Sequence, residues 1–206
     1  MKLKNFLLFV FVLAVAAVLT LVATLPAAAQ DPDWHHQLRG TYFSTGDTSC
    51  VNSSTGFNPN LTPATGATVY FQSVAFQGTW RFHSDGTVTG QNTELLLTLP
   101  PSGFAGAGSD NNSFTGTYTV ADDGVVTLEV GLVTGTFTTG PFTGLTLSVT
   151  PPPLSGRIAR DRTAISLTST IPNLETVTLT TPAGVTVAVV PRICYRTRTL
   201  IPIHED

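Results

Sequence analysis

The fold is decided by the stretch Phe114-Thr-Gly-Thr-Tyr-Thr-Val120, which is followed by Asp122-Asp123-Gly124 and by the segment Val125-Val-Thr-Leu-Glu-Val130. In the first segment Phe114, Tyr118 and Val120 share one face, because successive side chains of a strand point to opposite sides. Asp-Asp-Gly is typical of a tight turn, and the run after it returns along the first segment. The stretch therefore predicts a β-hairpin.

The same alternation recurs along the chain after Gln30, and no segment there shows a sustained helical period. Polar, glycine-rich stretches at 51–67 and 100–113 are predicted to be loops. The turn Ser84-Asp85-Gly86 predicts a second hairpin. The other predicted strands are 38–45, 68–75, 77–83, 87–89, 94–99, 132–137, 142–149, 154–159, 163–168, 174–180, 185–190 and 192–200.

The N-terminus has the layout of a secretory signal peptide. Lys2 and Lys4 precede an apolar run at 6–25, Pro26 breaks that run, and three alanines at 27–29 precede Gln30. We expect residues 1–29 to be cleaved and residues 30–206 to form one secreted or periplasmic domain with no stable membrane insertion. The alternative is that the run is retained as a membrane anchor, since it is long enough to span a bilayer.

The charge of the chain argues against a nucleic-acid partner. Both lysines precede residue 30, so residues 30–206 carry eight arginines, thirteen acidic residues and a net charge of −5. Binding to phosphates needs a basic face, which such a composition does not provide.

Two cysteines, Cys50 and Cys194, predict one disulfide in an oxidising compartment. The bond would join the segment after the first strand to the last strand. About ten short antiparallel strands must also manage their edges, and closing into a barrel removes them. The sequence therefore predicts an all-β fold, a single antiparallel meander closed into a barrel of about 8–10 strands. A two-sheet β-sandwich is the alternative.

A resemblance supports the barrel. The first strand opens with Gly40-Thr41-Tyr42, a Gly-x-aromatic pattern, and the last strand carries Arg192, Arg196 and Arg198. This resembles the calycin arrangement of lipocalins, in which a Gly-x-Trp of the first strand packs beneath a basic residue of the last; here Tyr42 replaces the tryptophan. The sequence pattern at 78–88 and 114–120 is also similar to that of a group of uncharacterised secreted bacterial proteins. The resemblance implies a lipocalin-like barrel and brings no known activity.

No cluster of reactive side chains predicts catalysis or metal binding. His83-Ser84-Asp85 holds the three residue types of a hydrolytic triad, but consecutive residues of a strand cannot converge on one atom, so a turn is expected. His35-His36 is expected in an N-terminal tail, and Asp110-Asn-Asn-Ser113 in a polar loop. Arg192, Arg196 and Arg198 share a strand face and could together hold an anionic ligand. We expect instead an outward polar face, or one arginine at the barrel end while the others pair with Asp161, Glu175 or Glu129. We expect no enzyme, no cofactor and no metal site.

Five aromatic residues form the best candidate ligand site. If their strand faces line the barrel, they would enclose an apolar pocket. The sequence therefore predicts a non-catalytic barrel that binds a small apolar or amphipathic ligand. The alternative is a structural or surface-interaction protein of the cell envelope with no ligand, for which the low charge and long polar loops argue. The five candidate ligand-binding residues are Tyr42, Trp80, Phe82, Tyr118 and Tyr195.

Overall fold

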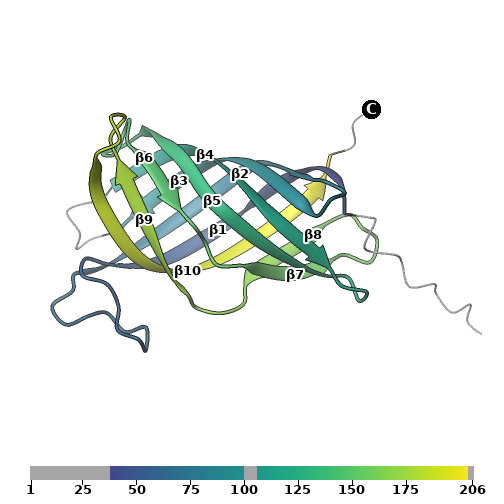
Figure 1. Cartoon of the computed structure of the whole chain (residues 1–206), viewed down its shortest axis with the longest axis horizontal. Helices are drawn as coiled ribbons and strands as arrows, with labels where there is room; N and C mark the ends of the chain where they lie inside the picture. Colours follow the sequence, from purple (N-terminus) through teal and green to yellow (C-terminus); the bar gives the residue numbers. More distant parts are fainter. Residues whose placement is uncertain (1–37, 100–105, 204–206) are drawn as a thin grey trace, which may run out of the picture. The chain divides into compact units, whose positions relative to one another are not determined.

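The computed structural model describes residues 38–99 and 106–203, which form ten β-strands in one antiparallel sheet (Figure 1). The expected signal peptide at 1–29 and the tail with His35 and His36 lie outside these residues. A membrane-spanning helix is not found in the described part of the chain. The strands are β1 Gly40–Ser53, β2 Val69–Phe82, β3 Thr87–Thr98, β4 Gly106–Val120, β5 Val125–Thr139, β6 Thr146–Val149, β7 Leu154–Ile158, β8 Ile165–Ser169, β9 Leu174–Thr180 and β10 Thr186–Pro202.

The sheet closes on itself as a ring of eight strands. Its order is β1-β2-β3-β4-β5-β6-β9-β10, and β10 pairs with β1 over 11 residue positions. Cys50 lies directly opposite Cys194 in that pairing, and the two form a disulfide. The predicted all-β antiparallel fold is confirmed, and the predicted disulfide joins the two strands that complete the ring.

The predicted antiparallel meander is confirmed, but two positions of the ring are each occupied by two short strands, so the ring is not a clean barrel. β6 and β7 both pair with β5, one after the other, while β8 and β9 both pair with β10. Between β6 and β7 lies Pro151-Pro152-Pro153, and the facing connection 170–173 contains Pro172. Proline has no backbone N–H to donate, so the ladder stops at the same level in both positions.

The loop predicted for 100–113 is wrong in its second half, because β4 begins at Gly106. Glycine, asparagine and aspartate have low strand propensity. Here they pair on both sides, with β3 and with β5, and the ladders override the propensity. The first predicted loop is shorter than expected for the same reason, since β1 continues to Ser53 opposite β2 and β10.

Two apolar clusters fill the interior at different levels. The aromatic cluster is built around Tyr42, Trp80, Phe82 and Phe114, with Tyr118 packed against it. Its rings meet edge to face at centroid distances of 5.0–5.3 Å, which is a favourable geometry for aromatic pairs. The second, aliphatic-rich cluster consists of Val74, Leu96, Phe137, Leu147, Val149, Val177 and Leu179.

Candidate functional site

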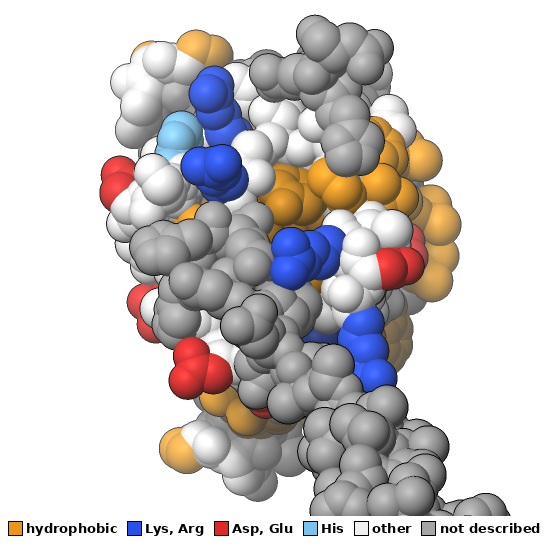
Figure 2. Space-filling model, turned by 90° about the vertical axis from the view of Figure 1, so that its right-hand side faces the viewer, with side chains coloured by type: hydrophobic (Ala, Val, Ile, Leu, Met, Phe, Trp, Pro, Cys, Tyr) orange, Lys and Arg blue, Asp and Glu red, His pale blue; other side chains and the backbone are white. Residues whose placement is uncertain are grey.

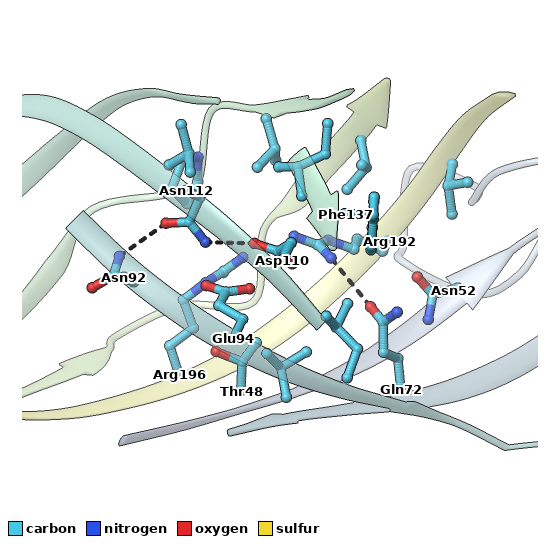
Figure 3. Close-up of a pocket in the computed structure, with 18 of the residues that line it drawn as sticks. Thr48, Asn52, Gln72, Asn92, Glu94, Asp110, Asn112, Phe137, Arg192 and Arg196 are labelled. Carbon is cyan, nitrogen blue, oxygen red and sulfur yellow. Dashed lines mark hydrogen bonds between the residues drawn. The ribbon is translucent and has the colours of Figure 1, made fainter. Parts of the chain in front are cut away.

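A cavity of about 120 Å³ lies inside the ring and is lined by residues of both clusters (Figure 3). One side of it is apolar and is formed mainly by β5, β6 and β9. The other side is polar and is formed by inward-facing side chains of β1, β2, β3, β4 and β10. The apolar wall includes Val133, Phe137, Leu147, Val149, Val177 and Leu179, and the polar wall includes Thr48, Asn52, Gln72, Asn92, Glu94, Asp110, Asn112, Arg192, Arg196 and Arg198.

A chain of four hydrogen-bonded side chains crosses the polar wall from β2 to β4. The Trp80 indole N–H donates to Asn92 Oδ1 at 2.8 Å, and Asn92 Nδ2 donates to Asn112 Oδ1 at 3.0 Å. Asn112 Nδ2 then donates to Asp110 Oδ1 at 2.9 Å. Because each amide uses its oxygen to accept and its nitrogen to donate, the chain has one direction and ends on the carboxyl group of Asp110.

Glycines opposite the two asparagines leave the space that this chain needs. Gly78 faces Asn92 across the β2–β3 ladder, and Gly135 faces Asn112 across the β4–β5 ladder. A Cβ atom at Gly135 would lie 2.6 Å from Asn112 Cβ, and one at Gly78 would overlap Asn92. Any larger residue at either position would therefore displace an amide from the chain.

A buried cluster of ion pairs lies beside the chain. Glu175 on β9 is 4% exposed and accepts hydrogen bonds from Arg192 Nε, at 2.6 Å, and from Arg196 Nη2, both through Oε1. Arg192 Nη1 also donates to Gln72 Oε1 at 3.3 Å. Buried charges of this kind persist only when they are paired, and here one carboxylate serves two guanidinium groups.

Arg198, the third arginine of the polar wall, forms no ion pair with a carboxylate of the residues that the structure describes. Its Nη1 donates to the backbone oxygens of Asp47 and Thr197, and its Nη2 donates to Thr48 Oγ1 at 3.0 Å. The guanidinium carbon lies 3.6 Å from the centroid of the Phe76 ring. Burial lowers the pKa of Arg198 to about 9, although nearby Glu94 acts in the opposite direction.

Two carboxyl groups, those of Asp110 and Glu94, face each other in this wall. They are direct partners across the β3–β4 ladder, an arrangement that brings Cβ atoms to about 5 Å. Burial raises the pKa of Asp110 to about 7, and the charge of Glu94 adds to the effect. The hydrogen bond from Asn112 and the charge of Arg192 lower this pKa, but burial prevails.

Three buried polar atoms of the ionic groups lack a hydrogen-bond partner among the residues that the structure describes. They are Asp110 Oδ2, Glu175 Oε2 and Arg196 Nη1. Asp110 is fully buried and Arg196 is 5% exposed, and both line the cavity. Such orphaned atoms are costly in a folded protein unless a water or a ligand satisfies them.

The five predicted ligand-binding aromatics are placed differently from one another. Trp80 lines the cavity. Tyr42 and Phe82 belong to the aromatic cluster, and Tyr118 packs on it with its hydroxyl directed to the backbone oxygens of Leu38 and His83. Tyr195 lies on the outer face of β10 with 58% of its surface exposed. The structure therefore brings four of the five together inside the ring, and places only Trp80 among the residues that line the cavity.

The expected outward face for the arginines is wrong, because Arg192, Arg196 and Arg198 all line the cavity. The pairing with Glu175, which is expected if one arginine lies at the barrel end, is present for Arg192 and Arg196. Arg192, Arg196 and Arg198 share strand parity with Cys194, and the disulfide places that parity inside the ring. The parity that the arginines share with Cys194 is visible in the sequence, but only the burial of the disulfide shows that this face points inward. Asp110 and Asn112 could not be found in this way, because their segment was assigned to a loop.

The turn predicted at His83-Ser84-Asp85 is confirmed, since Asp85 Oδ1 accepts hydrogen bonds from both the backbone nitrogen and the hydroxyl of Thr87. The structure also excludes a metal site built on Cys50, Glu175 and Cys194 while the two sulfurs are bonded to each other. The polar wall and the cavity are therefore the candidate site of the described chain. Comparison with protein-family models, with curated proteins and with solved structures finds no match to this chain.

Proposed function

We propose that this protein is exported from the cytoplasm and binds a small amphipathic molecule inside its ring of strands without catalysing a reaction. The observation that carries the proposal is the cavity with one apolar and one polar wall. Ligand sites are mostly apolar and have a few polar groups that orient the ligand. Export is supported by the N-terminal sequence pattern and is compatible with the disulfide.

The volume of the cavity limits the size of the ligand. An apolar cavity of about 150 Å³ accommodates benzene. At about 120 Å³, the cavity suits a molecule of roughly five to eight non-hydrogen atoms. We therefore propose a compact ligand with a short apolar part against Phe137, Leu147 and Val149, and a polar head against Asp110 and Arg196.

Trp80 provides the readout for a direct test. The chain has two tryptophans, so a Trp34→Phe variant leaves Trp80, which lines the cavity, as the only one. Its fluorescence would be titrated with four compounds of matched size: pentanoate, pentanamide, 1-pentanol and pentylammonium. We expect saturable binding of at least one of them at a 1:1 ratio, and no saturable response to any of the four would contradict the proposal.

A pair of variants on neighbouring residues controls for the location of binding. Val133 lines the cavity, whereas Leu132 points outward and is 56% exposed. Val133→Phe adds volume inside the cavity and is expected to abolish binding, while Leu132→Phe adds the same ring outside and is expected to leave it unchanged. Equal binding by both variants would place the ligand elsewhere.

A second candidate function, association with other proteins or with itself, is favoured by the outer surface. An apolar strip crosses β3, β2, β1, β10 and β9, and in it Phe71, Leu97 and Leu174 are between 43% and 57% exposed. Contiguous exposed apolar surface is unusual on a monomer. The strip consists of Leu97, Leu99, Phe71, Val51, Ile193 and Leu174, which follow one another through the ladders.

Sedimentation over a range of concentrations tests this second function. We expect association that weakens when Phe71 and Leu97 are both replaced by threonine and persists in Leu132→Thr, a change of the same kind outside the strip. A monomer at all concentrations would remove self-association as a candidate. Nucleic acid is not proposed as a partner, because residues 30–206 carry thirteen acidic residues against eight arginines, and acidic side chains accompany the basic ones on the face drawn in Figure 2.

A further inference from the structure

On the assumption that the proposed binding function holds, the buried atoms of the polar wall that lack a hydrogen-bond partner indicate the chemical class of the ligand's head group. Arg196 Nη1 is a buried donor without a partner, and Asp110 Oδ2 is a buried carboxyl oxygen without a partner, in the part of the chain that the structure describes. Both residues line the same cavity. A ligand that satisfies them must accept a hydrogen bond from the guanidinium and must also bond to the carboxyl group.

The charges around the cavity favour an anion at this position. Around the cavity, three guanidinium groups carry positive charge and two carboxylates, Glu94 and Glu175, carry negative charge; the guanidinium groups are those of Arg192, Arg196 and Arg198. Asp110 adds no charge when it is protonated. The wall then has one positive charge in excess, in a region where buried charge is costly. One negative charge on the ligand would bring the sum to zero.

Asp110 is suited to carry that proton. Its carboxyl group is fully buried and faces Glu94 across the ladder. Two carboxylates in such a position do not both ionise readily, so one of them retains a proton near neutral pH. A protonated Asp110 can donate to a carboxylate oxygen of a ligand, whereas an ionised Asp110 would repel it.

We propose that the cavity binds a small organic carboxylate, whose head lies between Arg196 Nη1 and the protonated carboxyl group of Asp110, and whose short apolar tail packs against β5 and β6. Binding is therefore coupled to the protonation of Asp110. The other charged or titratable groups around the head are Glu94 on β3, Glu175 on β9, Arg192 and Arg198 on β10, and Tyr70 on β2, while β5 and β6 contribute apolar side chains to the cavity lining.

The test compares pentanoate with its neutral isostere pentanamide between pH 6 and pH 8.5, with the Trp80 fluorescence described above. Pentanoate stays ionised throughout this range, so any pH dependence belongs to the protein. With the pKa of Asp110 at about 7, the affinity for pentanoate is expected to fall about 30-fold across this range, because the protonated fraction falls by that factor. Calorimetry at pH 8 in two buffers of different ionisation enthalpy should show uptake of about one proton per pentanoate bound.

Asp110→Asn separates a binding role of this residue from a structural one. The amide keeps an oxygen for Asn112 and offers a permanent donor to the ligand. We expect the variant to bind pentanoate with an affinity that changes less than about 3-fold over the same pH range. Glu129→Gln removes an exposed carboxylate from β5 and should retain the wild-type pH dependence.

The outcomes distinguish this inference from the proposed function. If pentanamide, 1-pentanol or pentylammonium binds the wild type as tightly as pentanoate at pH 6, the carboxylate assignment is overturned while the binding function stands. Pentanoate affinity that does not change with pH in the wild type overturns the role of Asp110. If none of the four compounds binds at any pH, both the inference and the proposed function fail.

Discussion

Gly90, on the inner face of β3, is a residue whose missing side chain determines the packing around it. It lies between Trp80 of β2 and Phe114 of β4 in the ladders, and these two rings meet edge to face above it, 5.0 Å apart. A Cβ atom at Gly90 would overlap the Phe114 ring. Since Trp80 begins the hydrogen-bonded chain to Asp110, this glycine supports both the core and the cavity.

Gly90→Ala is therefore expected to reduce the free energy of unfolding by about 1–3 kcal/mol, which is typical of overpacking in a core. Denaturant unfolding in the Trp34→Phe background, followed by Trp80 fluorescence, measures the change. Thr89→Ala, on the exposed face of the same strand, should change the stability by less than about 0.5 kcal/mol. Equal stability of Gly90→Ala and the wild type would show that Phe114 moves away without cost.

Asp110 makes the free energy of unfolding decrease as the pH rises. Its pKa is raised from 3.8 to about 7 in the folded state, so the folded protein binds more protons than the unfolded chain between these values. Stability contributed by this group is therefore greatest at low pH and is lost as the pH rises through about 7. Burial is the main cause, because an ionised Asp110 must lose its hydration.

Relative to wild type, Asp110→Asn should become more stable by on the order of 2 kcal/mol when the pH is raised from 5 to 8, because only the wild type then buries an additional charge. Urea unfolding of both proteins at the two pH values gives this difference. A constant difference between the two proteins would mean that Asp110 keeps one protonation state throughout.

At the scale of elements, the short strands β7 and β8 complete the ring between β5 and β10, beyond the prolines that end the ladders of β6 and β9. Each has five residues, and they pair with each other and with β5 and β10. Gly156 lies opposite Leu167 in their ladder, and a Cβ atom there would overlap the Ser166 backbone. The close approach of the two backbones therefore requires glycine at this position.

Gly156→Ala is expected to loosen β7 and β8 and to reduce the free energy of unfolding by about 1–3 kcal/mol. Hydrogen exchange should locate the effect: amides of β7 and β8 lose protection first, while those of β1 to β4 retain it. Ser155→Ala, one residue earlier, serves as the control. Uniform loss of protection along the chain would show that the two short strands do not open separately from the rest.

At the scale of the whole molecule, closure depends on the pairing of the first strand with the last. β1 and β10 are far apart in the sequence, and the disulfide joins residues 144 positions apart, near the end of their ladder that is closed by the pair of Asn52 and Arg192. Bringing such distant strands together has a large entropic cost in the unfolded chain. The disulfide reduces that cost because it is already formed in the unfolded, oxidised protein.

Reduction of the disulfide is expected to lower the free energy of unfolding by about 2–5 kcal/mol while the strand content is retained at low denaturant. Circular dichroism during denaturation, with and without reductant, measures both quantities. In a variant with Cys50→Ala and Cys194→Ala, the reductant should have no effect. A wild-type transition that does not respond to the reductant would show that the β1–β10 ladder closes the ring without help from the bond.

Much of the fold could be predicted from local patterns in the sequence. The hairpin at 114–130 follows from its alternation and its Asp-Asp-Gly turn, and the structure contains β4 and β5 there. The prediction failed at Gly106–Ser113, and it did not extend to the arrangement of the short strands around prolines 151–153, although strands are predicted there at 142–149, 154–159, 163–168 and 174–180. In the first case pairing on both sides overrides weak strand propensity. In the second, two short strands share one long neighbour, a relation between distant segments that local patterns do not contain.

The sequence by itself determined the antiparallel all-β class and the single possible pairing of its two cysteines. Only the tertiary structure decided which face of each strand points inward. Along β10 the inner face carries Arg196, Arg198 and Leu200, and the outer face carries Tyr195, Thr197 and Ile201. Alternation separates the two faces of the strand, but both faces mix polar with apolar residues, so the pattern does not indicate which face points inward. Arg196 is buried because Glu175, on the neighbouring strand of the ring, forms ion pairs with it and with Arg192.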